Sequence, residues 1–295
     1  MIDPKAITTY AQYNEDVILL ALLHDVKKGF YVDVGANYPT TDSVTKLFYE
    51  RGWRGVNIEP VKSLYQDFKN ERPQDINLQI GAGAKTGSAI LREYINSPGH
   101  STFDKTQKET KEQTLEYEDY EVEVKPLAAI LEDKKVKHIH FLKIDVEGFE
   151  HQVVAGNDWA KFRPEVVCIE ANHIQKDWKT TLLKNQYKLF IQDGLNEYYV
   201  AEESWDRTDD FAERVIKLDY FALKQHQAQS WAEDIKQLDR LTKITEDQHN
   251  LIKILEHQSS HSLKDQPMME RLKRSASGLT IDWLKYKKDN RPKKT

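Results

Sequence analysis

The chain contains little cysteine and no long apolar run, and both absences exclude whole classes of protein. Cys168 is the single cysteine in 295 residues, so a disulfide framework is excluded and a reducing compartment is expected. No apolar run approaches the roughly 20 residues needed to cross a bilayer. Residues 1–5 lack the basic-then-apolar order of a signal peptide. A soluble, cytoplasmic protein is therefore expected.

A net positive charge is absent from most of the chain and is found only at its C-terminal end. Residues 264–295 hold ten basic and four acidic side chains, a net charge of +6, so that the remainder carries −11 of the total −5. Beyond about residue 221 the pattern is helical and polar, with a weak heptad seam. We expect a body at residues 1–225 and a helical, basic extension at residues 226–295. The extension could be a solvated terminus that contributes only solubility. Weak docking on a membrane surface, docking on a protein and homodimerisation are the other open roles.

Short β-rich runs alternate with helical patterns from about residue 30 to 170. This alternation predicts an α/β fold with a doubly wound, mostly parallel sheet. The expected strands cover, in chain order, residues 30–34, 55–58, 76–80, 140–145 and 166–169. The third of these strands is expected to end at residues 81–83, and a helix is expected to begin at Glu147.

Antiparallel pairs are expected at two further places. Residues 89–94 and 121–125 alternate with period two and predict a hairpin or edge strands. The long polar stretch between them, residues 97–119, predicts a lid or binding loop. Residues 187–192 and 197–201 flank a turn and predict a late antiparallel hairpin.

Phosphate-binding glycines are missing from the loop after the first expected strand. A dinucleotide site needs Gly-x-Gly-x-x-Gly, because amides at a helix N-terminus hold the pyrophosphate. The loop begins with Gly35, but Asn37 and Thr40 occupy the second and third glycine positions, and Pro39 removes a donor. A phosphate-bearing cofactor is therefore disfavoured.

An acidic residue, Glu59, closes the second expected strand, 26 residues after Asp33. In a doubly wound sheet, a carboxylate there suits the two adjacent hydroxyls of a ribose. A cofactor with a ribose and no phosphate fits, and S-adenosylmethionine is the common one. In this interpretation Gly35 allows close approach of the backbone, Asp33 reaches the amino-acid end, and Glu59 holds the ribose. Gly81 and Ala82 would border the adenine.

Several motifs in combination resemble the FkbM family of methyltransferases. They are residues 31–37, 52–60, 142–150 and 169–170, supported by residues 10–16, 101–102 and 193–196. The resemblance spans about residues 10 to 205. It implies a class I methyltransferase (Rossmann-like) fold, S-adenosylmethionine as donor, and usually O-methylation, often of a sugar hydroxyl. It also adds Gln12, Asn37 and Ser101 to the expected cofactor-binding residues.

Polar residues at the ends of the fourth and fifth expected strands are the candidates for chemistry. Because a sulfonium donor is already activated, the protein has to align the acceptor oxygen and accept its proton. Lys143, Asp145, Glu170 and His173 stand at these ends, and His173 is a candidate general base because imidazole titrates near neutral pH. Aromatic residues that could stack on a sugar are Tyr117, Tyr120, Trp178, Tyr198, Tyr199 and Trp205.

A metal-assisted mechanism uses some of the same positions. Asp145, Glu170 and Asn172 supply the hard oxygen ligands that Mg²⁺ prefers. The arrangement is similar to that of metal-dependent catechol O-methyltransferases, in which the ion binds two acceptor hydroxyls. Spacing does not show that the three oxygens converge, so a metal-free site stays the alternative.

The sequence therefore predicts an S-adenosylmethionine-dependent O-methyltransferase. Its expected acceptor is a carbohydrate or another small molecule in polysaccharide or natural-product biosynthesis, and no nucleic-acid partner is expected. Two alternatives remain open at this point. One is a nucleotide- or NAD-binding oxidoreductase, and the other is a non-enzymatic module whose basic tail docks to an assembly partner.

Overall fold

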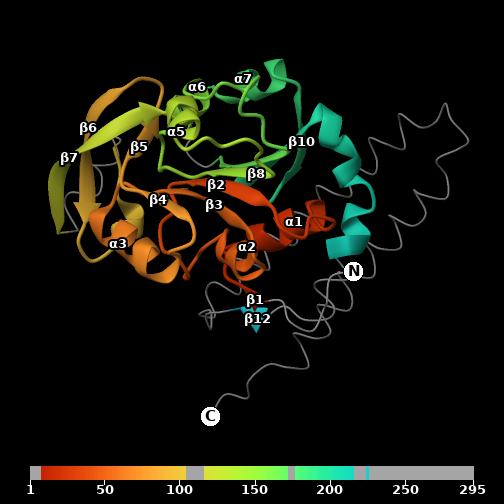
Figure 1. The fold of residues 1–295 in the computed structure, drawn as a ribbon, viewed down its shortest axis with the longest axis horizontal. Helices are drawn as coiled ribbons and strands as arrows, with labels where there is room; N and C mark the ends of the chain where they lie inside the picture. The colour runs from red at the N-terminus through yellow and green to blue at the C-terminus, as the bar shows by residue number, and fades with distance from the viewer. Residues whose placement is uncertain (1–7, 104–115, 172–176, 216–223, 226–295) are drawn as a thin grey trace, which may run out of the picture.

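A computed structural model describes residues 8–103, 116–171, 177–215 and 224–225, which form a main sheet, a smaller sheet and a short strand pair (Figure 1). The seven strands of the main sheet are β2 Phe30–Val34, β3 Arg54–Ile58, β4 Ile76–Leu78, β8 Phe141–Ile144, β9 Val166–Glu170, β10 Tyr187–Gln192 and β11 Asn196–Ala201. The five expected parallel strands and the late hairpin are therefore all present, although β4 is shorter than predicted.

The strand order identifies a doubly wound sheet with one antiparallel strand inserted. The order is β10-β11-β9-β8-β2-β3-β4. Without β11, it is the order 3-2-1-4-5-6 of a Rossmann-like sheet, read from β4 to β10. β11 runs antiparallel to both of its neighbours, β9 and β10. This is the predicted class I methyltransferase fold. The order reverses between β2 and β8, so a ligand crevice is expected beyond the carboxyl ends of these two strands.

Helices cover both faces of the main sheet (Figure 1). The helices on one face are α1 Glu15–Leu22 and α2 Lys46–Glu50. Those on the other face are α5 Leu127–Asp133, α6 Glu150–Ala155 and α7 Lys179–Lys184. The sequence analysis did not predict α1, α5 and α7. α3, Lys62–Glu71, connects β3 to β4 and buries Leu64 against the smaller sheet.

Residues of the central strands alternate between these two cores. Tyr31 and Phe141 lie directly opposite each other and stack on the α1/α2 face, with ring centroids 5.6 Å apart. Val32 and Leu142 follow them and join the core beneath α5, α6 and α7. Because successive side chains of a strand point to opposite faces, this pattern fixes which polar residues of β2 and β8 face α1 and α2.

The smaller sheet carries the predicted hairpin and corrects one expectation. It consists of β5 Gly81–Gly83, β6 Gly87–Tyr94 and β7 Tyr117–Pro126. β6 and β7 pair antiparallel, as expected. The third strand is expected to end at residues 81–83, but β4 ends at Leu78 and residues 81–83 form a separate strand, β5, parallel to β7. A Cβ atom on Gly83 would lie 2.8 Å from a methyl carbon of Val124, so β5 has no room for a side chain there. Gly156 also approaches β5 closely, since a Cβ atom on it would lie 1.9 Å from the carbonyl oxygen of Gly83.

The beginning of α6 corrects a second expectation. The helix predicted to begin at Glu147 begins at Glu150. Glu147 and Gly148 have φ values of +53° and +95°, which continue no right-handed helix. The loop after β8 is therefore wound tightly before α6 starts.

Four short elements complete the described chain: β1 Thr8–Thr9, η2 Pro98–His100, η3 Glu202–Thr208 and β12 Lys224–Gln225. β1 pairs parallel with β12. The predicted extension at residues 226–295 lies outside the described residues, as does part of the predicted lid. In the part of the chain that is described, no helix is long and apolar enough to cross a membrane.

Candidate active site at the carboxyl edge of the sheet

Gly35 brings the loop after β2 against the loop after β8. Its φ is +74°, and a Cβ atom on it would lie 1.8 Å from the carbonyl oxygen of Asp145. The amide of Asp145 donates a hydrogen bond to the carbonyl of Val34 at 3.0 Å. The two loops that flank the point of strand reversal are thus in direct backbone contact, and Gly35 is required there by both its conformation and the lack of space.

Glu59, at the end of β3, points back into the loop after β2. Its side chain is buried, with an exposed fraction of 4%. Oε2 accepts a hydrogen bond from the amide of Asn37 and Oε1 from the amide of Val61, both at 2.8 Å. Burial raises the pKa of Glu59 to about 7, although these two amides and Lys143 act against the rise. Each oxygen keeps a further lone pair, so the carboxylate can still accept hydroxyl donors from a ligand.

Asn37 lies between this loop and the hairpin of the smaller sheet. Its φ is +57°, and its Oδ1 atom is buried without a hydrogen-bond partner among the described residues. A Cβ atom on Gly99 would lie 2.9 Å from the Asn37 side-chain amide. Gly99 belongs to η2, Pro98–His100, which follows β6. The predicted lid therefore begins directly over the loop after β2, while its closure stays a prediction.

The remaining cofactor-binding candidates occupy different surroundings. Gly81 and Ala82 are buried within β5, where Gly81 faces Val124 and Phe103. The hydroxyl of Ser101 accepts a hydrogen bond from the backbone amide of Tyr94 at 3.3 Å, within its own hairpin. Gln12 is exposed on the turn before α1. Contact of these residues with a cofactor stays a prediction.

Lys143, on β8, is buried and contacts residues of both β2 and the loop after β8. Asp33, Lys143 and Cys168 lie directly opposite one another on β2, β8 and β9, on the face covered by α1 and α2. The Lys143 ammonium donates to the carbonyl of Gly35 at 2.7 Å. It lies 3.5 Å from Asp33 Oδ1 and 3.4 Å from Asp145 Oδ2. The ammonium thus holds the loop after β2 and two carboxylates around one centre.

The charge state of Lys143 follows from those two carboxylates. Burial by itself lowers the pKa of Lys143, but Asp145 and Asp33 outweigh it and hold the pKa above its ordinary value. The side chain therefore stays protonated at neutral pH and cannot serve as a general base. Its role is to position the two carboxylates and the Gly35 carbonyl.

Arg72 supports the site from beneath, and the sequence analysis missed it. Its guanidinium is fully buried and donates to the hydroxyls of Thr45 at 2.7 Å and Ser43 at 2.6 Å, and to the carbonyl of Pro39. Thr45 in turn donates to Asp33 Oδ2 at 2.8 Å. No sequence pattern predicts these hydrogen bonds. They join the end of α3 to the segment after β2, and only the tertiary fold brings the two together.

Asp145 and Glu170 meet where β8 and β9 end. Glu170 has an exposed fraction of 8%, whereas the Asp145 side chain is 38% exposed. Burial raises the pKa of Glu170 well above its ordinary value, and the nearby carboxylates of Asp145, Glu147 and Glu150 raise it further. Glu170 Oε2 is buried without a hydrogen-bond partner among the described residues. The raised pKa favours the protonated form of Glu170 at neutral pH, and the Asp145 side chain is the more exposed of the two.

The proposed magnesium set is only partly within view. Asp145 and Glu170 lie together, as the prediction requires, but Asn172 lies outside the described residues, and so does the candidate base His173. The three-ligand set and the ion therefore stay a prediction.

The aromatic candidates for sugar stacking are mostly used elsewhere. Trp178, Tyr198 and Tyr199 are buried in the two cores, so their prediction as stacking platforms is wrong. The guanidinium of Arg92 lies 3.6 Å from the ring centroid of Tyr117 and covers one face of it. Apolar side chains of this size gain more from burial in a core than from a place on the surface.

The fold and the strand-end residues together define a class I methyltransferase. The chain matches the methyltransferase FkbM domain over residues 33–189, more than half of its length. It therefore belongs to the FkbM methyltransferase family, which confirms the resemblance seen in the sequence and identifies the chain as a methyltransferase.

Two further comparisons add little to this assignment. The curated proteins include no match to the chain. Among solved structures, a protein of Streptococcus pneumoniae with a proposed tRNA (m1A22) methyltransferase activity is similar at 10% identity. The match covers 88% of this chain and 96% of that chain, with a TM-score of 0.33. A likeness of this degree supports no inference about the substrate.

Proposed function

We propose that the chain transfers a methyl group from S-adenosylmethionine to a hydroxyl oxygen, with a carbohydrate as the acceptor class. The observation that supports the cofactor most is the environment of Glu59. Two backbone amides orient its carboxylate at the carboxyl edge beside the point of strand reversal. The neighbouring loop lacks the glycines of a phosphate site, so a ribose without a phosphate is the ligand that this acid suits.

The residues at the ends of β8 and β9 supply the acid and base functions of the proposal. The bound sulfonium would supply an activated methyl group. Asp145 then accepts the proton of the acceptor hydroxyl as the oxygen becomes nucleophilic. Burial and the neighbouring carboxylates raise the pKa of Glu170, so its protonated form limits the charge at this edge. Lys143 keeps Asp145 beside the Gly35 loop, and so beside the cofactor.

The acceptor class rests on two supports. The FkbM family resemblance implies hydroxyl acceptors, often in sugars. The described wall beyond β8 also presents the partly exposed carboxyl groups of Asp145 and Glu147, while Glu150 and Glu170 are buried behind it. Such a wall favours a neutral acceptor rich in hydroxyl groups over one that carries phosphate or carboxylate at this point.

Calorimetric titration with S-adenosylhomocysteine tests the cofactor. We expect binding by the full chain and a loss of about 100-fold for Glu59→Ala, since two hydrogen bonds to a charged group are removed. The matched control is Glu132→Ala, which removes an exposed carboxylate that is paired with Lys161. Unchanged affinity in Glu59→Ala, or tight NADH binding in place of S-adenosylhomocysteine, would reject the proposed site.

Transfer of labelled methyl groups to a panel of glycans tests the chemistry separately. Asp145→Asn is expected to abolish turnover while S-adenosylhomocysteine still binds, because the amide cannot take up the acceptor proton. Full turnover in Asp145→Asn would reject the assignment of the base. Methylation of amines in preference to hydroxyls would reject the acceptor class.

A further inference from the structure

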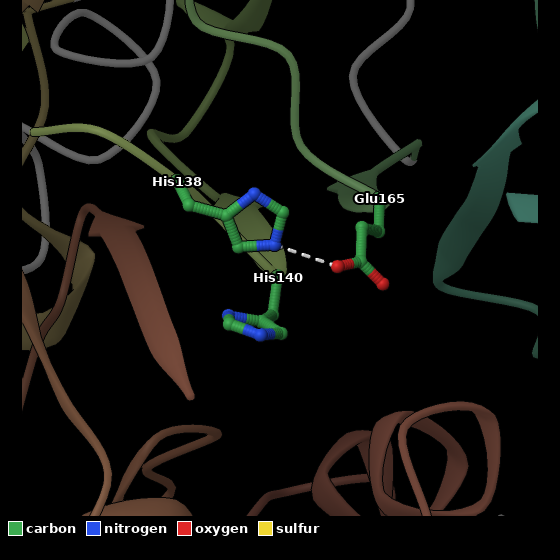
Figure 2. Close-up of side chains that lie close together, drawn as sticks. All are labelled: His138, His140 and Glu165. Carbon is green, nitrogen blue, oxygen red and sulfur yellow. Dashed lines mark hydrogen bonds and ion pairs between the residues drawn. The ribbon is translucent and has the colours of Figure 1, made fainter. Parts of the chain in front are cut away.

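A second cluster of chemically capable side chains lies at the opposite edge of the main sheet. His138 and His140 precede β8, and Glu165 precedes β9 (Figure 2). β8 and β9 are parallel neighbours, so their starts meet at the edge far from the Glu59 crevice. The histidines are two residues apart on an extended segment, which places both rings on one side of it. Their ring centroids are 4.4 Å apart, with the ring planes almost perpendicular.

The donor atoms of the three side chains are close enough to share one ion. His138 Nε2 lies 2.7 Å from Glu165 Oε1. One donor atom from each of His138, His140 and Glu165 can be chosen so that all three lie within 4.8 Å of one another. Ligand atoms around a tetrahedral Zn²⁺ stand about 3.4 Å apart, given bonds of about 2.1 Å. Small rotations of the side chains therefore suffice to bring all three to one ion.

Arg207 fixes the carboxylate for this role. Its Nε donates to Glu165 Oε2 at 2.5 Å, and its Nη1 contacts Asp25 at 2.6 Å. Glu165 Oε1 is thereby left directed at His138. An outer hydrogen bond of this kind commonly orients a carboxylate that ligates a metal.

The adjoining cavity favours a cation. It has a volume of about 420 Å³ and is lined by Asp25, His138, Arg163, Glu165, Glu203, Ser204, Asp206 and Arg207. Four of these residues are carboxylates and two are guanidiniums, so the lining is net negative when the histidine is neutral. The His138 side chain is 58% exposed, which leaves an open route for an ion and for water.

We propose that His138, His140 and Glu165 form a binding site for Zn²⁺ or another late first-row divalent cation, with the remaining coordination positions open to water. Two imidazoles and one carboxylate are a ligand set that such ions prefer over Mg²⁺ or Ca²⁺. The site is independent of methyl transfer, since it stands at the opposite edge of the sheet. A bound ion would link the start of β8 to the start of β9, and Arg207 connects the Glu165 ligand to η3.

One contact sets the strength of this site. His140 Nδ1 accepts a hydrogen bond from the amide of Phe30 at 3.0 Å, so the proton of the neutral ring stands on Nε2. Ligation through Nε2 moves that proton and breaks the bond to Phe30. The affinity is therefore expected to be moderate, with a Kd on the order of 1 μM.

Titration of the full chain with Zn²⁺, in parallel with variants, tests the proposal. His138→Ala and His140→Phe are each expected to weaken the binding at least about tenfold. The phenylalanine keeps a ring against Trp53, which lies 5.2 Å from the His140 ring. The chain has ten histidines, so the difference between variants, and not the total uptake, reports the site. His151→Ala, on α6, is the matched control and should bind Zn²⁺ as the unchanged chain does.

The melting temperature gives an independent readout. Zn²⁺ should raise the Tm of the unchanged chain and of His151→Ala, but not that of His138→Ala. The exposure of His138 makes a folding defect in its variant small, and the Tm without Zn²⁺ checks this. Equal Zn²⁺ affinity in His140→Phe and the unchanged chain would overturn the three-ligand site, and so would a Tm that does not respond to Zn²⁺.

Discussion

Cofactor binding should be linked to the protonation of Glu59. In the free protein the pKa of Glu59 is raised to about 7 by burial, so the carboxyl group is largely protonated under mildly acidic conditions. Ribose hydroxyls donate to the ionised form, and hydrogen bonds to a charged group contribute about 1.5–3 kcal/mol each. Two of them would lower the pKa by about 2 units or more, since one unit corresponds to about 1.36 kcal/mol.

The sign and size of the effect follow from that shift. A ligand that binds the ionised carboxylate binds most tightly above the pKa of the free protein and loses affinity as the pH falls below it. The affinity should therefore be constant above about pH 7 and about 30-fold weaker at about pH 5.5. Glu59→Gln removes the titration, so its affinity should vary little with pH and approach that of the unchanged chain at about pH 5.5.

Calorimetry with 5′-methylthioadenosine measures this linkage cleanly. This probe keeps the adenosine and lacks the amino-acid end, so no ligand group titrates in the same range. The reasoning is refuted if the unchanged chain binds equally well at both pH values, or if Glu59→Gln keeps the full pH dependence.

Three further predictions concern the architecture around the site. Gly52 has a φ of +86°, and a Cβ atom on it would meet no atom within 4 Å, whereas a Cβ atom on Gly35 would meet the Asp145 carbonyl. Urea unfolding should show a loss of about 1 kcal/mol for Gly52→Ala and of more than about 3 kcal/mol for Gly35→Ala, and equal losses would contradict the close approach. Arg72→Leu should lower the free energy of unfolding by about 2–4 kcal/mol, because the buried acceptors lose their donor, and a loss below about 0.5 kcal/mol would contradict this role. Burial raises the pKa of Asp16 to about 6 and that of Glu59 to about 7. Because the folded state holds these protons more tightly than the unfolded state, the free energy of unfolding of the free protein should fall as the pH rises from about 5 to about 8, and urea titrations showing a rise would contradict the burial of these acids.

Most of the main sheet was predictable because its strands are short, apolar and separated by helical patterns. The smaller sheet was less so. Gly81–Gly83 has the composition of a turn, and only the approach of Gly156 and the pairing with β7 make it a strand. Likewise, nothing in the periodicity shows that Glu147 and Gly148 adopt positive φ and delay the start of α6.

The candidate site, too, was only partly predictable from the sequence. Strand-end carboxylates such as Glu59, Asp145 and Glu170 are predictable, because the carboxyl ends of parallel strands meet at one edge of a sheet. Their charge states are not, since these depend on burial and on neighbours that the fold supplies. The contacts of Arg72 also arise only in three dimensions. His138 and His140 carried a readable signal, two imidazoles on one side of a strand, but at the edge where no ligand is ordinarily sought.

The contact between Gly35 and the Asp145 carbonyl has a consequence for diversification within such enzymes. It sets the distance between the loop after β2, on the proposed cofactor side, and the loop after β8, on the proposed acceptor side. Main-chain atoms make this contact, so it does not depend on the conformation of any side chain. Surface segments that select the acceptor can therefore change in length and composition over evolution. The distance between the two loops, and with it the separation of the proposed methyl donor and acceptor, would stay the same.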